Sequence, residues 1–211
     1  MTRILHIETS PRKQRSASIQ VAQAFIDRYV ELHPDTTVDR LDVWHLQMPE
    51  FDGHAMEAKY AGLAGVERTD AQREAWRQIN ELAQPFRDAD LFVFGVPLWN
   101  YGIPYKLKHL IDAISQKDVL FTFNPDEGIR GMLHAKKAVM AYARGTTLSD
   151  DSDTPARLFD YQQGYMNMWL NMIGVTDIES IVIEKTLYGP EIDGDSRQEA
   201  VREAIALASR M

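Results

Sequence analysis

The segment LFVFGVPLWNYGIPYKLKHLID, residues 91–112, contains a strand, a loop and the start of a helix in direct succession. Residues 91–96 are almost entirely apolar, which is typical of a strand buried on both faces of a parallel sheet, and we expect this strand to be central. Pro104 is suited to the first position of a helix, whose apolar residues then share one face: Leu107, Leu110, Ile111 and Ile114. The loop at 97–103 therefore follows the carboxyl end of a central strand.

Strand and helix patterns alternate along the rest of the chain. Apolar runs predict four more strands, at residues 4–7, 36–43, 136–143 and 178–183. Helical spacing predicts helices at residues 19–30, 155–174 and 197–209. A further helix is expected to begin after the capping box formed by Thr69 and Gln72. We expect one short helix within the connection at 44–68, whose role the sequence leaves open, and a short hairpin around 124–128.

This alternation predicts the fold class. It favours an α/β protein with helices on both faces of a parallel sheet, and five strands of this kind fit a flavodoxin-like doubly wound sheet with strand order 2-1-3-4-5. Residues 1–211 contain no internal repeat, low-complexity tract or composition shift, so we expect a single domain.

The composition excludes several function classes. The 211 residues include 23 Lys and Arg against 31 Asp and Glu, a formal charge of −8 that disfavours nucleic acid as a partner. The chain has no cysteine, so redox chemistry has to come from a cofactor. The first residues are too short an apolar run for a signal peptide and no segment is long enough to cross a bilayer, so we expect a cytoplasmic protein without membrane contact.

In a doubly wound sheet, ligands bind at the carboxyl ends of the strands, near the point where the strand order reverses. The loop after the first strand, TSPRKQRSAS at residues 9–18, offers hydroxyl groups, three cations and the first amides of a helix. These groups suit a phosphate monoester, although Ser and Thr are also common as ordinary helix caps. The chain has no G-x-G-x-x-G or P-loop motif, so neither of those cradles is expected.

Two further loops lie at the same expected edge. Trp99 and Tyr101 flank Asn100 after the central strand, an arrangement that suits a flat heterocycle with a polar edge. Taken singly, an aromatic residue such as Trp99 or Tyr101 is more often part of core or interface packing. The loop ARGTTLSD, residues 143–150, supplies backbone N–H groups and the cation of Arg144, suited to a negatively charged ligand or to a solvated turn.

These segments, with YGPE at 188–191, resemble the FMN-dependent NADH azoreductases and their NAD(P)H quinone reductase relatives, over essentially the whole chain. The stretch at 97–112 carries the most specific part of the resemblance. Ala143 lacks the hydroxyl found in the family's turn, and Thr146 replaces a glycine there. The resemblance implies that the following residues bind FMN: Ser10, Ser16, Ala17, Ser18, Leu98, Trp99, Asn100, Tyr101, Ala143, Arg144, Gly145 and Thr146.

The resemblance also implies the reaction. FMN would carry hydride from NADH or NADPH to a quinone or azo compound in two-electron, ping-pong turnover. No catalytic side chain is implied beyond the flavin, with Asn100 and Gly145 as candidates for tuning its charge. A homodimer is implied, in which the partner subunit completes each flavin site. The proposed substrate pocket walls are aromatic residues that also fit core packing: Phe121, Phe123, Tyr161 and Tyr165.

Other function classes stay open at this point. A flavodoxin-type electron carrier and a general NAD(P)H:FMN reductase share the expected fold. A receiver domain shares it as well, but Thr9 and Ser10 stand where acidic residues would follow the first strand. The six histidines show no pair at metal-ligand spacing, and no nucleophile elbow is present, so neither a metal site nor a hydrolase is predicted. The natural electron acceptor and the choice between NADH and NADPH are not encoded in these motifs.

Overall fold

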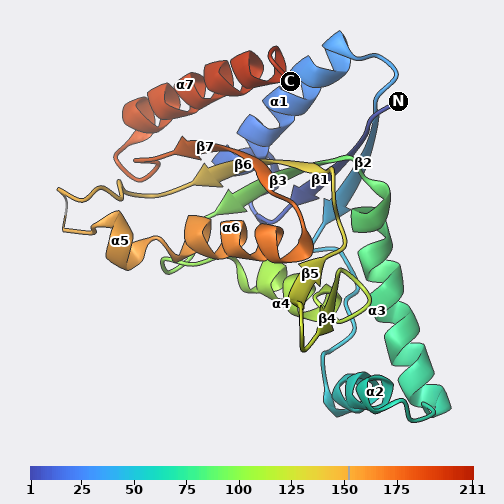
Figure 1. The fold of residues 1–211 in the computed structure, drawn as a ribbon. Helices are drawn as coiled ribbons and strands as arrows, with labels where there is room; N and C mark the ends of the chain where they lie inside the picture. The colour runs from blue at the N-terminus through green and yellow to red at the C-terminus, as the bar shows by residue number, and fades with distance from the viewer. Residues whose placement is uncertain (152) are drawn as a thin grey trace.

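A computed structural model describes residues 1–151 and 153–211 of the chain. Five strands form one parallel sheet in the order β2-β1-β3-β6-β7, which confirms the predicted flavodoxin-like topology (Figure 1). The strands of this sheet are β1 (Arg3–Glu8), β2 (Thr37–Asp42), β3 (Leu91–Pro97), β6 (Lys137–Ala143) and β7 (Asp177–Ile183). As expected, β3 lies at the centre and is buried over almost its whole length.

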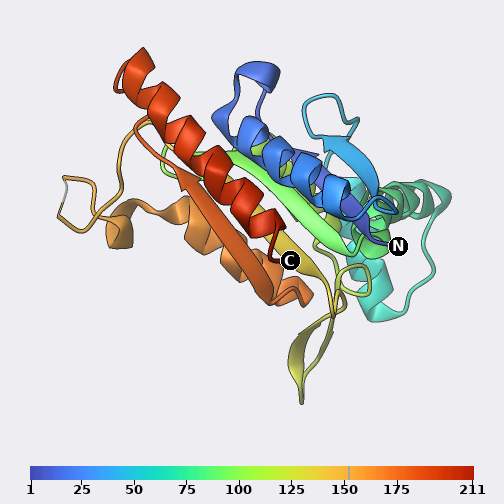
Figure 2. The ribbon, with the colours of Figure 1, turned by 90° about the horizontal axis from the view of Figure 1, so that it is seen from above.

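Helices cover both faces of the sheet. The helices are α1 (Ala17–Leu32), α2 (Gly53–Ala64), α3 (Asp70–Asp88), α4 (Tyr105–Ile114), α5 (Ala156–Phe159), α6 (Tyr161–Ile173) and α7 (Pro190–Ala208). Figure 2 shows α1 and α7 side by side on one face, while Figure 1 shows α3, α4 and α6 on the other. Within the described residues, no helix has both the length and the apolar sequence needed to cross a membrane.

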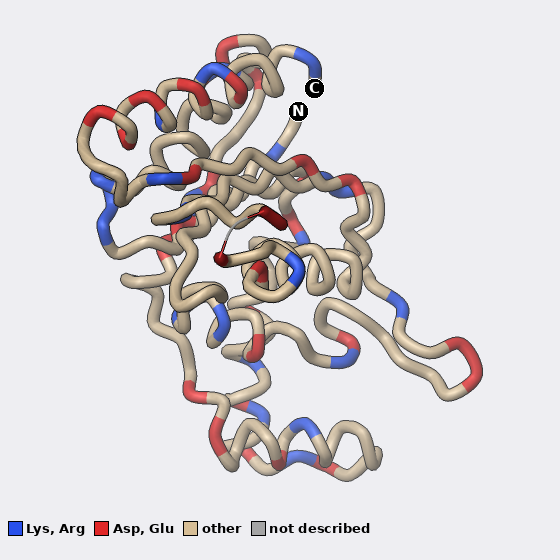
Figure 3. Tube along the Cα trace, turned by 90° about the vertical axis from the view of Figure 1, so that its left-hand side faces the viewer, with Lys and Arg blue, Asp and Glu red and all other residues tan. Residues whose placement is uncertain are grey.

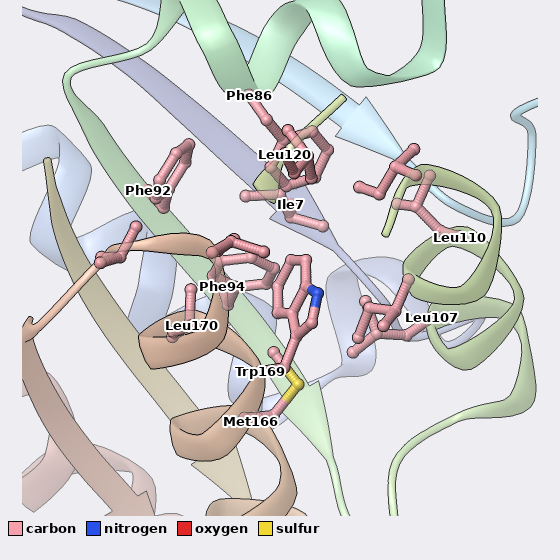
Figure 4. Packing of buried hydrophobic residues seen from close by; sticks show 14 of the residues in the cluster. Ile7, Phe86, Phe92, Phe94, Leu107, Leu110, Leu120, Met166, Trp169 and Leu170 are labelled. Atoms are coloured by element: carbon pink, nitrogen blue, oxygen red, sulfur yellow. The ribbon is translucent and has the colours of Figure 1, made fainter. Parts of the chain in front are cut away.

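The alternation of side chains along β3 divides the core into two parts. Leu91 and Val93 pack toward α1 and α7, whereas Phe92, Phe94 and Val96 pack toward α3, α4 and α6. In this second part, Trp169 of α6 lies edge-on to Phe94, with ring centroids 6.2 Å apart (Figure 4). Both faces of the central strand are therefore covered by apolar side chains, as its sequence predicted.

Several element boundaries differ from the sequence expectations. Pro104 caps α4 rather than forming its first residue, and the helix expected from Pro155 to Gly174 is divided into α5 and α6. The division falls at Asp160, whose carboxylate accepts a hydrogen bond from the Gln163 amide at 2.9 Å and so caps α6. The last helix begins at Pro190, seven residues before the first residue that the apolar spacing indicated.

The predicted hairpin is present and projects from the sheet (Figure 2). It comprises β4 (Phe121–Asn124) and β5 (Gly128–Gly131), paired antiparallel. Its base contacts the end of α6, where the Leu133 amide donates to the carbonyl of Ile173 at 2.9 Å. The hairpin is thus attached to the helix that carries Tyr161 and Tyr165.

Candidate functional site

The carboxyl ends of β1, β3 and β6 meet at one edge of the sheet. Glu8 pairs in register with Gly95, and Pro97 pairs with Ala143. The Leu98 amide continues this pairing by donating to the Ala143 carbonyl at 2.7 Å. The three loops singled out in the sequence therefore begin side by side, at the point where the strand order reverses.

In the first loop, a short 3-10 helix (η1, Lys13–Arg15) leads into Ser16, the N-cap residue of α1. Among the described residues, the Ser16 side chain makes no capping hydrogen bond to the first turn of α1. Its hydroxyl instead lies 3.1 Å from the Ser18 hydroxyl, and both serines are buried, as are Ala17 and Ser10. The first amides of α1 thus lack a side-chain acceptor and stand beside two hydroxyl groups, a donor set that suits an anion.

The cations of this loop are partly engaged. Lys13 pairs with the Asp42 carboxylate, and its Nζ lies 3.6 Å from Glu8 Oε2. Burial opposes ionisation of Asp42, but hydrogen bonds from Lys13 and His45 lower the pKa of Asp42 below its usual value. Arg40 contributes a second cation to Glu8 at 3.2 Å. Lys13 therefore holds the loop against the end of β2, and its ammonium group pairs with carboxylates.

The second loop forms a tight turn. Trp99 and Gly102 exchange two backbone hydrogen bonds of 3.0 and 2.9 Å, and the two residues between them, Asn100 and Tyr101, have positive φ angles of 47° and 66°. Two central residues with positive φ correspond to a type I′ turn, which strongly prefers Asn-Gly. Tyr101 is strained in this conformation. Because Tyr101 stands where this turn type prefers glycine, the sequence did not indicate the turn.

Neighbouring segments hold this strained turn in place. The Tyr101 carbonyl accepts a hydrogen bond from the Tyr161 amide at 3.1 Å, and the Tyr101 ring lies 4.9 Å from that of Phe159. On the other side, Trp99 packs against Trp44, with ring centroids 5.6 Å apart. Sequence reading missed Trp44, which falls in the connection after β2, where no periodic signal marks it.

The third loop turns on a buried arginine. Arg144 is 4% exposed, and its guanidinium donates to Asp160 Oδ2 at 2.6 Å and to Gln162 Oε1 at 3.2 Å. Its Nη1 also lies 3.5 Å from Glu184 Oε1. The side-chain Nε2 of Gln162 in turn donates to the Val96 carbonyl at 2.9 Å. Arg144 therefore joins β3, α6 and the end of β7, so its side chain is occupied by protein acceptors.

Gly145 lies beside the segment that follows β7. The Leu187 amide donates to the Gly145 carbonyl at 3.1 Å, and a Cβ atom built on Gly145 would approach Leu187 Cδ1 to 2.6 Å. The next residue, Thr146, is half-buried. The lack of a side chain at Gly145 thus lets the turn and Leu187 approach closely.

A groove of about 930 Å³ adjoins the second loop. It lies between the loop, α4 and α6, and its wall includes Ile103, Tyr105, Lys108, Tyr161 and Tyr165. Burial raises the pKa of Tyr165 above its usual value, while the neighbouring Lys108 opposes this shift. The structure brings Tyr161 and Tyr165 together here, whereas within the described chain Phe121 and Phe123 lie on the hairpin, outside this wall.

Within residues 1–151 and 153–211, no group of three or more His, Asp or Glu side chains is arranged to hold a metal ion. The three loops supply hydroxyl and amide groups, the cations Arg12, Lys13 and Arg15, and Arg144, which is paired with carboxylates.

Comparison with known proteins gives consistent matches over the whole chain. A family model described as flavodoxin-like fold matches residues 2–208. The chain is 50% identical over 211 residues to FMN-dependent NADH:quinone oxidoreductase 3 of Pseudomonas fluorescens, covering 100% of this chain and 98% of that one. It is 54% identical over 209 residues to FMN-dependent NADH:quinone oxidoreductase 9 of Burkholderia lata, covering 99% of each.

Solved structures agree with these relatives. An azoreductase from Bacillus anthracis superposes with a TM-score of 0.88 at 27% identity, covering 100% of both chains. An FMN-dependent NADH-azoreductase from the same species, solved in complex with FMN, superposes with a TM-score of 0.86 at 25% identity and covers 100% of this chain and 99% of that one.

Proposed function

Because the chain belongs to the FMN-dependent NADH:quinone oxidoreductases of the flavodoxin-like fold, we propose that it binds FMN at the carboxyl edge of its sheet. With this cofactor it reduces quinones and azo compounds. Bound FMN would supply two-electron transfer from NADH to the acceptor. Donor and acceptor use the same site in turn, so that turnover is ping-pong.

The observation that carries this proposal is the N-terminus of α1. Its first amides lack a side-chain cap within the described chain, and the Ser16 and Ser18 hydroxyls lie 3.1 Å apart beside them. These groups, with Ser10 and the backbone of Ala17, form the site for the FMN phosphate. Hydroxyls and amides at a helix N-terminus are the donors that a phosphate monoester needs.

The second and third loops hold the flavin ring. Leu98, Trp99, Asn100 and Tyr101 would contact the ring from one loop, and the backbone from Ala143 to Thr146 would contact it from the other. The Asn100 side chain and the Gly145 backbone would stabilise negative charge on the flavin ring. Arg144 contributes by fixing the position of its loop, because Asp160 and Gln162 occupy its guanidinium.

The groove beside the second loop receives the acceptor. Tyr161 and Tyr165 form part of its wall. A homodimer completes it, and Phe121 and Phe123 of the projecting hairpin supply aromatic walls to the partner subunit's site. Phe123 is 47% exposed, so its ring is accessible for contact with a second subunit.

The first experiment is an anaerobic visible spectrum of the protein loaded with FMN, before and after NADH and then after a quinone. We expect NADH to bleach the flavin absorbance and the quinone to restore it. Binding of FMN without bleaching by NADH would favour an electron carrier that depends on a separate reductase. If FMN does not bind, the proposed function is wrong.

The phosphate site is tested by the double substitution Ser16→Ala and Ser18→Ala. Loss of two hydroxyl donors to a charged phosphate should weaken FMN binding by at least about a hundredfold, because such hydrogen bonds are each worth roughly 1.5–3 kcal/mol. The melting temperature of the FMN-free protein should change little. Ser209→Ala at the end of α7 is the matched control, and an FMN affinity equal to that control would remove the phosphate assignment.

A further inference from the structure

We propose that Trp44 is a positioning residue for the flavin site, acting on the phosphate-side loop and the ring-side loop with one side chain. The indole N–H of Trp44 donates to the Thr9 carbonyl at 2.9 Å. The same indole packs at a tilt against Trp99, with ring centroids 5.6 Å apart, and meets the Tyr105 ring edge-on, with centroids 5.4 Å apart. This inference rests on the proposed function and names a residue outside the three loops.

The first contact fixes where the phosphate-side loop leaves the sheet. Thr9 is tied to the central strand, since its hydroxyl donates to the Gly95 carbonyl at 2.7 Å and its amide donates to the same carbonyl at 3.3 Å. Its own carbonyl is the acceptor for Trp44. The peptide unit between Thr9 and Ser10 is therefore restrained from both sides before the loop continues to the serines.

The second contact fixes the ring-side loop. Trp99 occupies the first position of the strained turn, and Trp99 and Tyr105 also face each other, with centroids 6.3 Å apart. The three rings of Trp44, Trp99 and Tyr105 thus form a closed cluster. Aromatic pairs of this kind contribute about 0.5–1.5 kcal/mol each beyond the area that they bury.

Trp44 is itself held firmly. Its backbone amide donates to Asp42 Oδ1 at 3.0 Å, and the amide of the preceding residue, Val43, donates to the Glu8 carbonyl at 3.2 Å. Val43 is fully buried, and Asp42 is paired with Lys13. The end of β2 is thus a fixed base from which Trp44 reaches both loops.

The consequence is pre-organisation. The separation between the Thr9 carbonyl and the Trp99 ring is set by Trp44 before a ligand arrives, so FMN binds without having to order either loop. A residue with this role changes ligand affinity more than it changes the stability of the protein without ligand.

The test compares Trp44→Phe, which keeps an aromatic ring but removes the N–H donor, with Trp44→Leu, which removes both contacts. We expect the FMN dissociation constant to rise about fivefold in Trp44→Phe and about thirtyfold in Trp44→Leu, measured by quenching of flavin fluorescence. Trp76→Phe is the matched control, because Trp76 lies on α3 and packs under Arg68 at 4.5 Å. It should bind FMN as the wild type does.

Two readouts on the FMN-free protein separate positioning from general stability. The near-ultraviolet circular dichroism of the coupled indoles should be lost in Trp44→Leu and kept in Trp76→Phe. The melting temperature of Trp44→Phe should stay close to that of Trp76→Phe, although only the former loses FMN affinity. Wild-type FMN affinity in both Trp44 variants would overturn the inference and leave the proposed function intact. Failure of the wild type to bind FMN would instead overturn the proposed function.

Discussion

At the scale of single residues, the site depends on a buried cation that is fully engaged by its own protein. Arg144 is held by Asp160 and by Gln162, and its Nη1 also faces Glu184. The Glu184 carboxylate accepts the Leu148 amide at 3.1 Å as well, so the same carboxylate restrains a later part of the third loop. Because burying a charge is favourable only when it is paired, each member of this cluster depends on the others.

We therefore expect Arg144→Met to destabilise the FMN-free protein by about 3 kcal/mol, because two partly buried carboxylates lose their cation. Arg144→Lys should recover only part of this loss, since an ammonium group cannot match the planar guanidinium fork. Urea unfolding of the FMN-free protein measures both values.

Arg202→Met is the control for these variants. Arg202 pairs with Glu199 on the exposed side of α7, where its side chain is 64% accessible, so the change should be within about 0.5 kcal/mol. If Arg144→Met kept wild-type stability and lost only FMN affinity, Arg144 would be a direct flavin ligand instead of a residue that fixes the loop.

The sequence was informative about single residues only where local chemistry decides their place. Ser16 and Ser18 could be assigned to a helix start because hydroxyls before an amphipathic pattern have that local meaning. Arg144 is separated along the chain from its partners Asp160 and Gln162 by 16 and 18 residues. No local sequence pattern encodes pairs at such separations. Trp44 was missed for the same reason, because its partner Thr9 is 35 residues away.

At the scale of elements, two glycines allow the hairpin to contact α6. A Cβ atom built on Gly131, the last residue of β5, would lie 2.1 Å from the Gly174 backbone nitrogen and 2.2 Å from the Ile173 carbonyl carbon. Gly174 ends α6 with a φ of 101°, a left-handed conformation that favours glycine. The position of the hairpin, and of Phe123 on it, thus depends on backbone-to-backbone contact.

Gly131→Ala should consequently destabilise the protein by about 3 kcal/mol, because the atoms that it meets are backbone and cannot turn aside as a side chain could. Gly164→Ala provides a control with the same chemical change. Gly164 lies within α6 with nothing within 4 Å of its Cβ position, so alanine there should stabilise the protein by about 0.5–1 kcal/mol. Thermal unfolding of both variants gives the comparison, and equal effects would contradict the proposed contact.

Predictions of elements succeeded where a local signal was strong. The capping box of Thr69 and Gln72 is present at the start of α3, with both reciprocal hydrogen bonds. The start of α7 was placed too late, because its first two turns are largely polar and contain Gly194, so apolar spacing does not mark them. The division between α5 and α6 was missed because Asp160 reads equally well as an exposed helical residue.

At the scale of the whole molecule, the two parts of the core share one sheet. Residues of β3 contribute to both, and we propose on this ground that residues 1–211 fold as a single domain. The formal charge of −8 is spread over the surface, with acidic residues repeated along α7 (Figure 3). Net negative charge of this size acts against binding to nucleic acid but does not specify a fold.

The stability of the whole molecule should depend on pH through one histidine. His6 is fully buried on β1, with both ring nitrogens lacking a hydrogen-bond partner among the described residues, and burial, aided by the Arg40 charge, lowers its pKa to about 4. A folded-state pKa below the unfolded value of 6.5 means that the neutral ring is favoured in the fold. The resulting contribution, about 3 kcal/mol, is complete above pH 6.5 and is lost as the pH falls toward 4.

His6→Leu should remove this dependence, because an apolar side chain of similar volume keeps the buried position filled and has no proton to take up. The free energy of unfolding, measured in urea between pH 7 and pH 4, should therefore fall by about 3 kcal/mol less in His6→Leu than in the wild type. Carboxylates elsewhere in the chain are present in both proteins, so the difference between the two curves isolates His6. His134→Gln, a change at an exposed histidine, should follow the wild-type curve. Parallel curves for wild type and His6→Leu would show that water or Glu8, whose Oε1 lies 4.0 Å from Nδ1, already stabilises the protonated ring in the fold.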